Sequence, residues 1–165
     1  MNFNHLTLAL AGLVTMASAG AMANNVNNVI DLTGDTIFYG ALHSDNSPFV
    51  DTFDFSGVTG RVFASATLNT IGFVPEQNID FLNITLNGFP LTLSPNGDIE
   101  TGFTEFELEL NGPLQLIVEG ETGAGGGVFS SYSGTLNVRE IPEPAALTML
   151  ALGGILLVPR RRASA

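Results

Sequence analysis

Apolar side chains alternate with polar ones along most of this chain, and that period of two is the feature that most constrains its fold. The clearest apolar rows are Val62, Ala64, Ala66 and Leu68; Thr104, Phe106, Leu108 and Leu110; and Leu114, Leu116 and Val118. A strand of this kind buries one face and exposes the other. Two such layers packed face to face bury all of the apolar rows together.

Turn signals separate the alternating segments. Asn-Gly pairs stand at residues 87–88, 96–97 and 111–112, and such pairs are typical of hairpin turns. We predict strands near residues 26–32, 36–42, 49–56, 61–70, 78–87, 89–93, 99–110, 113–120 and 128–138. About eight or nine short strands predict an all-β fold, a single antiparallel β-sandwich of jelly-roll type.

The two ends of the chain differ from this middle part. Residues 1–23 are typical of a secretory signal peptide, with an apolar stretch from Leu6 to Met16 and small residues at Ala21 and Ala23. We expect signal peptidase to cleave before Asn24. The predicted layout is therefore a signal helix at 1–23, the β-sandwich at 24–139 and a hydrophobic C-terminal helix at 140–165.

The charge balance excludes one class of partner. Between Asn24 and Val138 the chain has fourteen carboxylates and one basic side chain, Arg61, and it contains no cysteine. Such a surface repels phosphate backbones, so we expect no nucleic-acid binding. Without cysteine there is neither a disulfide framework nor a thiolate site.

The segment from Phe49 to Phe55 is the most distinctive part of the predicted domain. Its period of two places Asp51 on the same face as Phe49 and Phe53, which should be the core face. A buried carboxylate needs hydrogen bonds from backbone N–H groups or a cationic partner. The scarcity of basic residues makes Arg61 the candidate cation.

Catalytic patterns are scarce. His43 is the one histidine after the predicted signal peptide, it falls in a predicted loop as a solvated residue, and no G-x-S-x-G sequence accompanies it. Glu105, Glu107 and Glu109 alternate with apolar residues, as on a solvated strand face. Two carboxylates could serve in glycoside hydrolysis, but no motif selects a pair. We expect no enzymatic activity.

Calcium and carbohydrate are the two ligand classes that the sequence leaves open. Aspartates in or near predicted turns suit Ca²⁺: Asp31, Asp35, Asp45, Asp54 and Asp98. No calcium-loop motif is present, so we predict no cofactor and keep Ca²⁺ as the alternative. Carbohydrate binding normally uses exposed aromatic side chains, but there is no tryptophan, Tyr39 and Tyr132 are the only tyrosines, and most of the twelve phenylalanines are predicted to lie in the core.

The C-terminal segment combines three physical parts. Pro142 and Pro144 flank Glu143 and disfavour helix and sheet pairing there. Residues 145–158 carry no charge, and Arg160, Arg161 and Arg162 follow. This tail resembles the PEP-CTERM sorting domain of exported bacterial proteins. Phe49, Asp51 and Phe53, together with residues 131–138 ahead of the tail, resemble the FxDxF group of that family.

The resemblance implies a route and a setting. It implies export across the inner membrane of a Gram-negative bacterium, a membrane-bound intermediate, and cleavage at Pro142-Glu143-Pro144 by an exosortase. The mature protein would lie at the cell surface or in the extracellular matrix, beside polysaccharide in a biofilm or floc, in a structural or adhesive role. The alternatives are a carbohydrate-binding sandwich or, less favoured, a glycan-active enzyme.

The length of the apolar segment favours processing over permanent anchoring. Fourteen helical residues reach about 21 Å, while a bilayer core is about 30 Å thick. Gly153 and Gly154 weaken the helix further. The arginines would stay on the cytoplasmic side. We therefore expect transient membrane insertion, with a retained anchor as the alternative.

Overall fold

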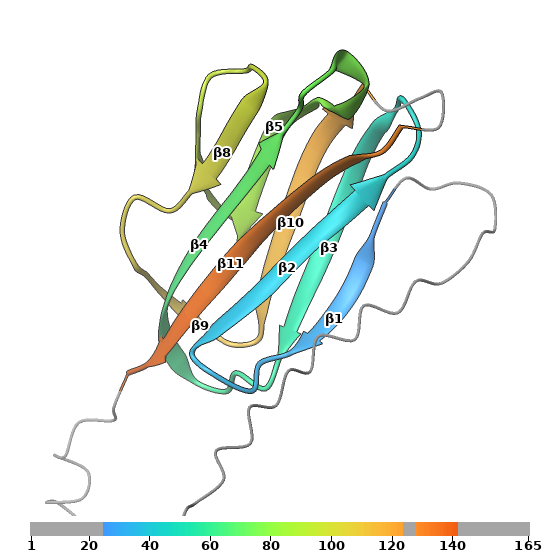
Figure 1. Ribbon diagram of the computed structural model, residues 1–165. Helices are drawn as coiled ribbons and strands as arrows, with labels where there is room; N and C mark the ends of the chain where they lie inside the picture. Colours follow the sequence, from blue (N-terminus) through green and yellow to red (C-terminus); the bar gives the residue numbers. More distant parts are fainter. Residues whose placement is uncertain (1–24, 124–127, 142–165) are drawn as a thin grey trace, which may run out of the picture.

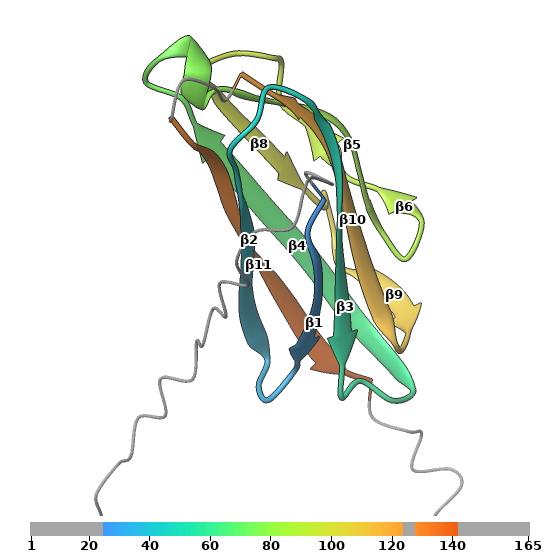
Figure 2. The ribbon, with the colours of Figure 1, turned by 90° about the vertical axis from the view of Figure 1, so that its right-hand side faces the viewer.

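Two β-sheets lie face to face in the computed structural model, which describes residues 25–123 and 128–141 (Figures 1 and 2). Sheet A contains β1 (Asn27–Asp31), β3 (Pro48–Ser56), β5 (Ile79–Leu86), β6 (Phe89–Pro90) and β10 (Leu114–Thr122). Sheet B contains β2 (Thr36–His43), β4 (Arg61–Ile71), β7 (Thr92–Leu93), β8 (Ile99–Phe103), β9 (Leu108–Asn111) and β11 (Ser130–Glu140). A 3-10 turn, η1 (Pro75–Gln77), links β4 to β5. The predicted all-β, two-sheet fold is confirmed.

The strands pair in a nested pattern. β2 pairs with β11, β3 with β10, β4 with β8 and β5 with β6, all antiparallel. The resulting orders are β1-β3-β10-β5-β6 and β2-β11-β4-β8-β7, with β9 beside β4. This outer-with-outer, inner-with-inner wrapping is the pairing of a jelly roll. The prediction of a wholly antiparallel structure is wrong at one edge, because β1 runs parallel to β3.

Two predicted strands are divided in the structure. The predicted strand 89–93 breaks at Leu91, whose buried side chain marks the crossing from β6 in sheet A to β7 in sheet B. The predicted strand 99–110 becomes β8 and β9. Between them the Thr104 N–H donates to the Ala66 carbonyl oxygen of β4, and the Thr104 hydroxyl accepts from the Ala66 N–H. Phe106 is exposed to solvent, so the predicted alternation of buried and exposed residues fails there.

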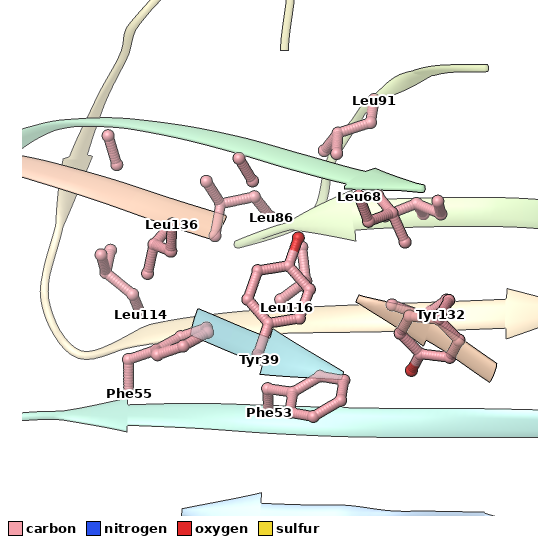
Figure 3. Packing of buried hydrophobic residues seen from close by; sticks show 14 of the residues in the cluster. Tyr39, Phe53, Phe55, Leu68, Leu86, Leu91, Leu114, Leu116, Tyr132 and Leu136 are labelled. Carbon is pink, nitrogen blue, oxygen red and sulfur yellow. The ribbon is translucent and has the colours of Figure 1, made fainter. Parts of the chain in front are cut away.

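The core fills the space between the sheets (Figure 3). The inward rows predicted on β4 and β10 are confirmed as buried. The largest inaccessible apolar side chains are Phe49, Phe53, Phe55, Leu68, Ile79, Ile84, Leu86, Leu114, Leu116 and Leu136. Burying each of them contributes about 1.5–3 kcal/mol, which makes this the main source of stability.

Gly134 on β11 makes room for the Tyr39 ring. The Tyr39 side chain is buried, packs its ring 5.2 Å from Phe53, and donates a 2.8 Å hydrogen bond from its hydroxyl to the Thr67 carbonyl oxygen. A Cβ on residue 134 would collide with that same oxygen and with the Tyr39 ring. The glycine is therefore required by packing across β2, β11 and β4.

We predict that Gly134→Ala lowers the free energy of unfolding by about 2 kcal/mol or more, because the core cannot take another methyl group there. Chemical denaturation followed by circular dichroism measures it. Gly97→Ala is the matched control, since a Cβ at Gly97 meets nothing within 4 Å, and its effect should stay within about 0.5 kcal/mol. Equal effects of the two substitutions would contradict the packing argument.

Candidate functional site

The Phe49-x-Asp51-x-Phe53 motif lies inside the sandwich. All three side chains belong to β3 and point between the sheets, with exposed fractions of 2%, 0% and 0%. The prediction that Asp51 shares the core face with the phenylalanines is confirmed. The motif therefore supplies core packing and one buried carboxylate.

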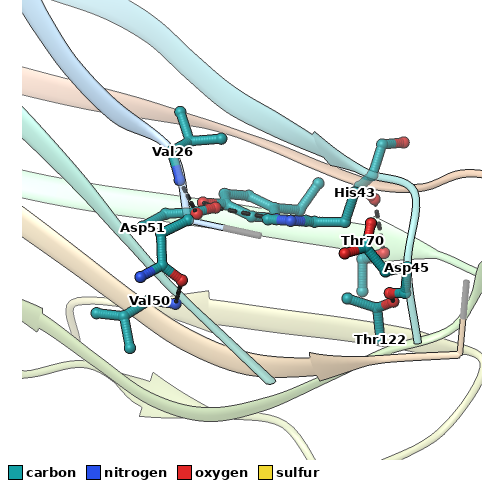
Figure 4. Close-up of polar contacts among 10 residues, drawn as sticks. Val26, His43, Asp45, Val50, Asp51, Thr70 and Thr122 are labelled. Carbon is teal, nitrogen blue, oxygen red and sulfur yellow. Dashed lines mark hydrogen bonds and ion pairs between the residues drawn. The ribbon is translucent and has the colours of Figure 1, made fainter. Parts of the chain in front are cut away.

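Three donors surround the Asp51 carboxylate, and Figure 4 labels two of the residues that supply them, Val26 and His43. Oδ1 accepts a 2.6 Å hydrogen bond from the backbone N–H of Val26, just ahead of β1. Oδ2 accepts from His43 Nε2 at 3.0 Å and from the Tyr132 hydroxyl at 2.5 Å. Because His43 lies on β2 and Tyr132 on β11, Asp51 ties sheet A to two strands of sheet B.

The expected pairing of Asp51 with Arg61 is wrong. The Arg61 side chain is 59% exposed and pairs with Glu109 of β9, while Asp51 is inaccessible. β4 begins at Arg61 with the side chain on the outer side of sheet B, so it cannot reach the core. Of the two kinds of partner that the sequence left open for Asp51, a backbone N–H is confirmed through Val26.

His43 was predicted to be a solvated loop residue, and that prediction is wrong. β2 continues to residue 43, and its alternation turns Tyr39 and His43 inward. The imidazole is 1% exposed and stacks on the Phe49 ring, with 4.0 Å between ring centroids. The segment Ser44–Ser47 that follows is polar and suggested a loop, so the sequence did not predict that His43 faces inward.

The cluster of His43, Asp51 and Tyr132 is built for stability. A carboxylate that orients an imidazole also occurs in hydrolase triads, but there the imidazole faces a nucleophile that substrate can reach. Here each side chain is at most 3% exposed. Burial, and then the Asp51 carboxylate, raise the pKa of the Tyr132 phenol far above its usual range. The phenol therefore stays protonated and donates to Asp51.

A second buried carboxylate lies on β8. Glu100 is 3% exposed and accepts hydrogen bonds from the backbone N–H groups of Phe81 and Gly97, at 2.9 and 3.1 Å. Burial raises its pKa, although the two backbone bonds oppose that shift. Sequence reasoning missed this residue, because a single glutamate between Ile99 and Thr101 carries no distinct signal.

The aspartates proposed as calcium ligands are not brought together. Within residues 25–123 and 128–141, no three histidine, aspartate or glutamate side chains are grouped closely enough to hold a metal ion. Asp54, for example, binds Gln115 Nε2 on the outer side of sheet A at 2.8 Å. Glu105, Glu107 and Glu109 are exposed, as predicted for a solvated face.

The prediction that most phenylalanines belong to the core is wrong. Four are buried, and they are Phe49, Phe53, Phe55 and Phe81. Six are exposed, and they are Phe38, Phe73, Phe89, Phe103, Phe106 and Phe129. Both tyrosines are buried instead. The surface therefore carries aromatic rings, although the chain has no tryptophan.

The predicted processing sites lie outside the described residues. These are the signal cleavage site at Ala21–Ala23, the sorting motif Pro142-Glu143-Pro144 and the basic cluster Arg160–Arg162. The last described residue, Ile141, donates a 3.1 Å backbone hydrogen bond to the Arg61 carbonyl oxygen. In the described part of the chain, no helix is long and apolar enough to cross a membrane.

Comparison with known proteins yields little. No protein-family model matches the sequence, and no curated protein matches it. Among solved structures, it is similar to PliG of Salmonella Typhimurium, a periplasmic inhibitor of g-type lysozyme, at 12% identity over 72% of this chain and 100% of that chain, with a TM-score of 0.28. PliG of Aeromonas hydrophila gives 11% identity, 70% and 99% coverage and a TM-score of 0.31. Similarities this low carry no functional argument.

We predict that Asp51→Ala lowers the free energy of unfolding by about 3–5 kcal/mol, because it leaves buried donors without an acceptor. Asp54→Ala is the matched control on the same strand, and its exposed carboxylate should cost at most about 0.5 kcal/mol. Urea denaturation of both variants measures the difference. A loss at Asp51 no larger than at Asp54 would show that the cluster does not hold the sheets together.

We also predict that neither tyrosine ionises in the folded protein at the usual pH of about 10. Burial raises the pKa of Tyr39 as well as that of Tyr132. Because both values are raised on folding, phenolate formation favours the unfolded chain, and stability falls as the pH rises above about 10. Near-ultraviolet titration should show phenolate appearing together with loss of the far-ultraviolet circular dichroism of the sheets. A phenolate signal that precedes unfolding would contradict the burial argument.

Proposed function

We propose that this chain is an exported β-sandwich with a structural or adhesive role at the cell surface or in the extracellular matrix, beside extracellular polysaccharide. It would reach that place through signal peptidase and an inner-membrane intermediate. An exosortase would then cleave it at Pro142-Glu143-Pro144. We assign it no catalytic reaction and no resident cofactor.

The observation that carries the proposal is the way the domain ends. β11 runs to Glu140, and the N–H of Ile141, the last described residue, donates a backbone hydrogen bond to Arg61 of sheet B. The Pro-Glu-Pro motif begins at the next residue. A processing enzyme that cleaves at the motif would therefore leave all of the strands described in residues 25–141 in the released product.

The chemistry of the buried groups supports a non-catalytic role. In the described part of the chain, the two inaccessible carboxylates are Asp51 and Glu100, and both accept hydrogen bonds from internal donors. The ion pairs Arg61–Glu109 and Arg139–Glu107 lie on the surface, where such pairs contribute little to stability. The buried polar groups of this chain hold its own two sheets together. This use of them is consistent with a structural role for an exported protein.

Mass spectrometry of the exported product tests the proposal, and it predicts a C-terminus between Pro142 and Pro144 in cells that contain an exosortase. Glu143→Ala should block the cleavage and leave the chain with the membrane fraction. Glu140→Ala, an exposed carboxylate just outside the motif, should be processed normally. A mature product that still carries Arg162 would refute processing and favour a permanent anchor.

A further inference from the structure

Neutral polar side chains occupy the middle of the outer side of sheet B. On β4 these are Ser65, Thr67 and Asn69; on β8, Thr101; and on β11, Ser131, Ser133, Thr135 and Asn137. We call these eight residues the hydroxyl–amide face. They point outward because the alternate residues of the same strands fill the core. Figure 1 shows β2, β11 and β4 side by side on this side of the molecule.

Strand register arranges the hydroxyl–amide face in rows across the sheet. Gly40 pairs with Ser133, Ser133 with Asn69, and Asn69 with Thr101, so small and polar side chains form one continuous row over four strands. In the neighbouring row Thr135 Oγ1 and Thr67 Oγ1 lie 2.9 Å apart and share a hydrogen bond. The polar groups of the face are therefore held in fixed positions by the pairing of the strands.

Two exposed aromatic rings stand at the ends of that neighbouring row. Phe38 pairs with Thr135, Thr135 with Thr67, and Thr67 with Phe103. Phe38 is 77% exposed and Phe103 is 39% exposed. Three strand spacings separate them, which is about 14 Å. Leu42 and Ile99 are exposed on the same two strands, Leu42 four residues after Phe38 and Ile99 four residues before Phe103.

None of the eight residues of the hydroxyl–amide face is charged. On the outer side of sheet A, by contrast, carboxylates recur on three strands at Asp54, Asp80, Glu119 and Glu121. On sheet B, the basic groups Arg61 and Arg139 lie toward the C-terminal end of β11 and are paired with Glu109 and Glu107. A neutral face offers no ion pairs to a charged partner, and the acidic chain around it repels anions. An uncharged partner meets no such electrostatic repulsion.

We propose that the hydroxyl–amide face, with Phe38 and Phe103 at its ends, binds a neutral polysaccharide. Sugar hydroxyls both donate and accept hydrogen bonds, as do the serine, threonine and asparagine side chains of the central rows. The C–H faces of pyranose rings stack on exposed aromatic rings, which supply apolar contact area. This inference rests on the proposed extracellular role and names the contact through which that role is exercised.

Affinity electrophoresis of the purified full-length chain tests the inference, with dextran, a mixed-linkage β-glucan or galactomannan in the gel. At least one of these neutral polymers should retard the protein, while alginate, a polyanion, should not. Phe38→Ala combined with Phe103→Ala should weaken the retarding affinity about tenfold or more, as expected when two anchor residues are removed. Phe38→Tyr combined with Phe103→Tyr, which keeps both rings, should retain binding.

Phe73→Ala combined with Phe89→Ala is the matched control, because it also removes two exposed rings but leaves this face intact. Three results would overturn the proposal: no retardation by any neutral polymer, equal loss in both alanine double variants, or equal retardation by alginate. Light scattering adds a fourth, since a dimer abolished by the Phe38/Phe103 variant would assign the face to a second copy of the chain. None of these results depends on C-terminal processing, so the two proposals fail separately.

Discussion

The free-energy cost of burying the Asp51 carboxylate constrains how the strands around it can pair. A charged or polar group without partners in a protein interior costs several kcal/mol, so the fold must deliver donors to it. Those donors are the Val26 N–H, the His43 imidazole and the Tyr132 hydroxyl, from segments far apart in the sequence. They meet only when β2, β3, β11 and the start of β1 have their observed register. A shift by one residue would turn Asp51 or its partners to the other face and leave a buried polar group unpaired. Asp51 therefore selects one register as well as adding stability.

The sequence predicted this arrangement in part, and the reason lies in the period of two. Alternation places Asp51 on the core face of its strand without any knowledge of the other strands. The identity of its donors depends on which strands cross above it, and no local pattern contains that information. Arg61 was a reasonable candidate by charge, yet its own alternation places it opposite to the buried Val62. The inward position of His43 was not predicted, because the polar segment after it suggested that the strand ends one residue early.

The phenylalanines show a different limit of sequence reasoning. Phenylalanine is usually a core residue, but within a strand the alternation of the backbone decides which side each residue faces. On β2 the inward positions are already taken by Tyr39 and His43, so Phe38 must point outward. On β8 Glu100 and Gly102 face inward, which leaves Ile99 and Phe103 outside. A larger side chain at Gly102 would require neighbours to shift, because a Cβ there would lie 2.8 Å from the terminal methyl groups of Ile84 and Leu68. The exposed aromatic surface follows from the way the core is filled.

The geometry of β11 would let one domain take part in both of the proposed encounters. In the sequence, its C-terminal end is followed by the proposed sorting motif, while its middle residues, Ser133 and Thr135, lie at the centre of the hydroxyl–amide face. Seven residues of extended strand separate Ser133 from Glu140, which corresponds to about 24 Å. A processing enzyme engaged at the end of the sandwich would thus leave the centre of that face uncovered. The acidic outer side of sheet A lies on the opposite side of the core and repels anionic polymers and lipid head groups. If the face binds a neutral polysaccharide, that repulsion orients the domain. Anionic groups of the matrix repel sheet A, so the domain approaches the matrix with sheet B.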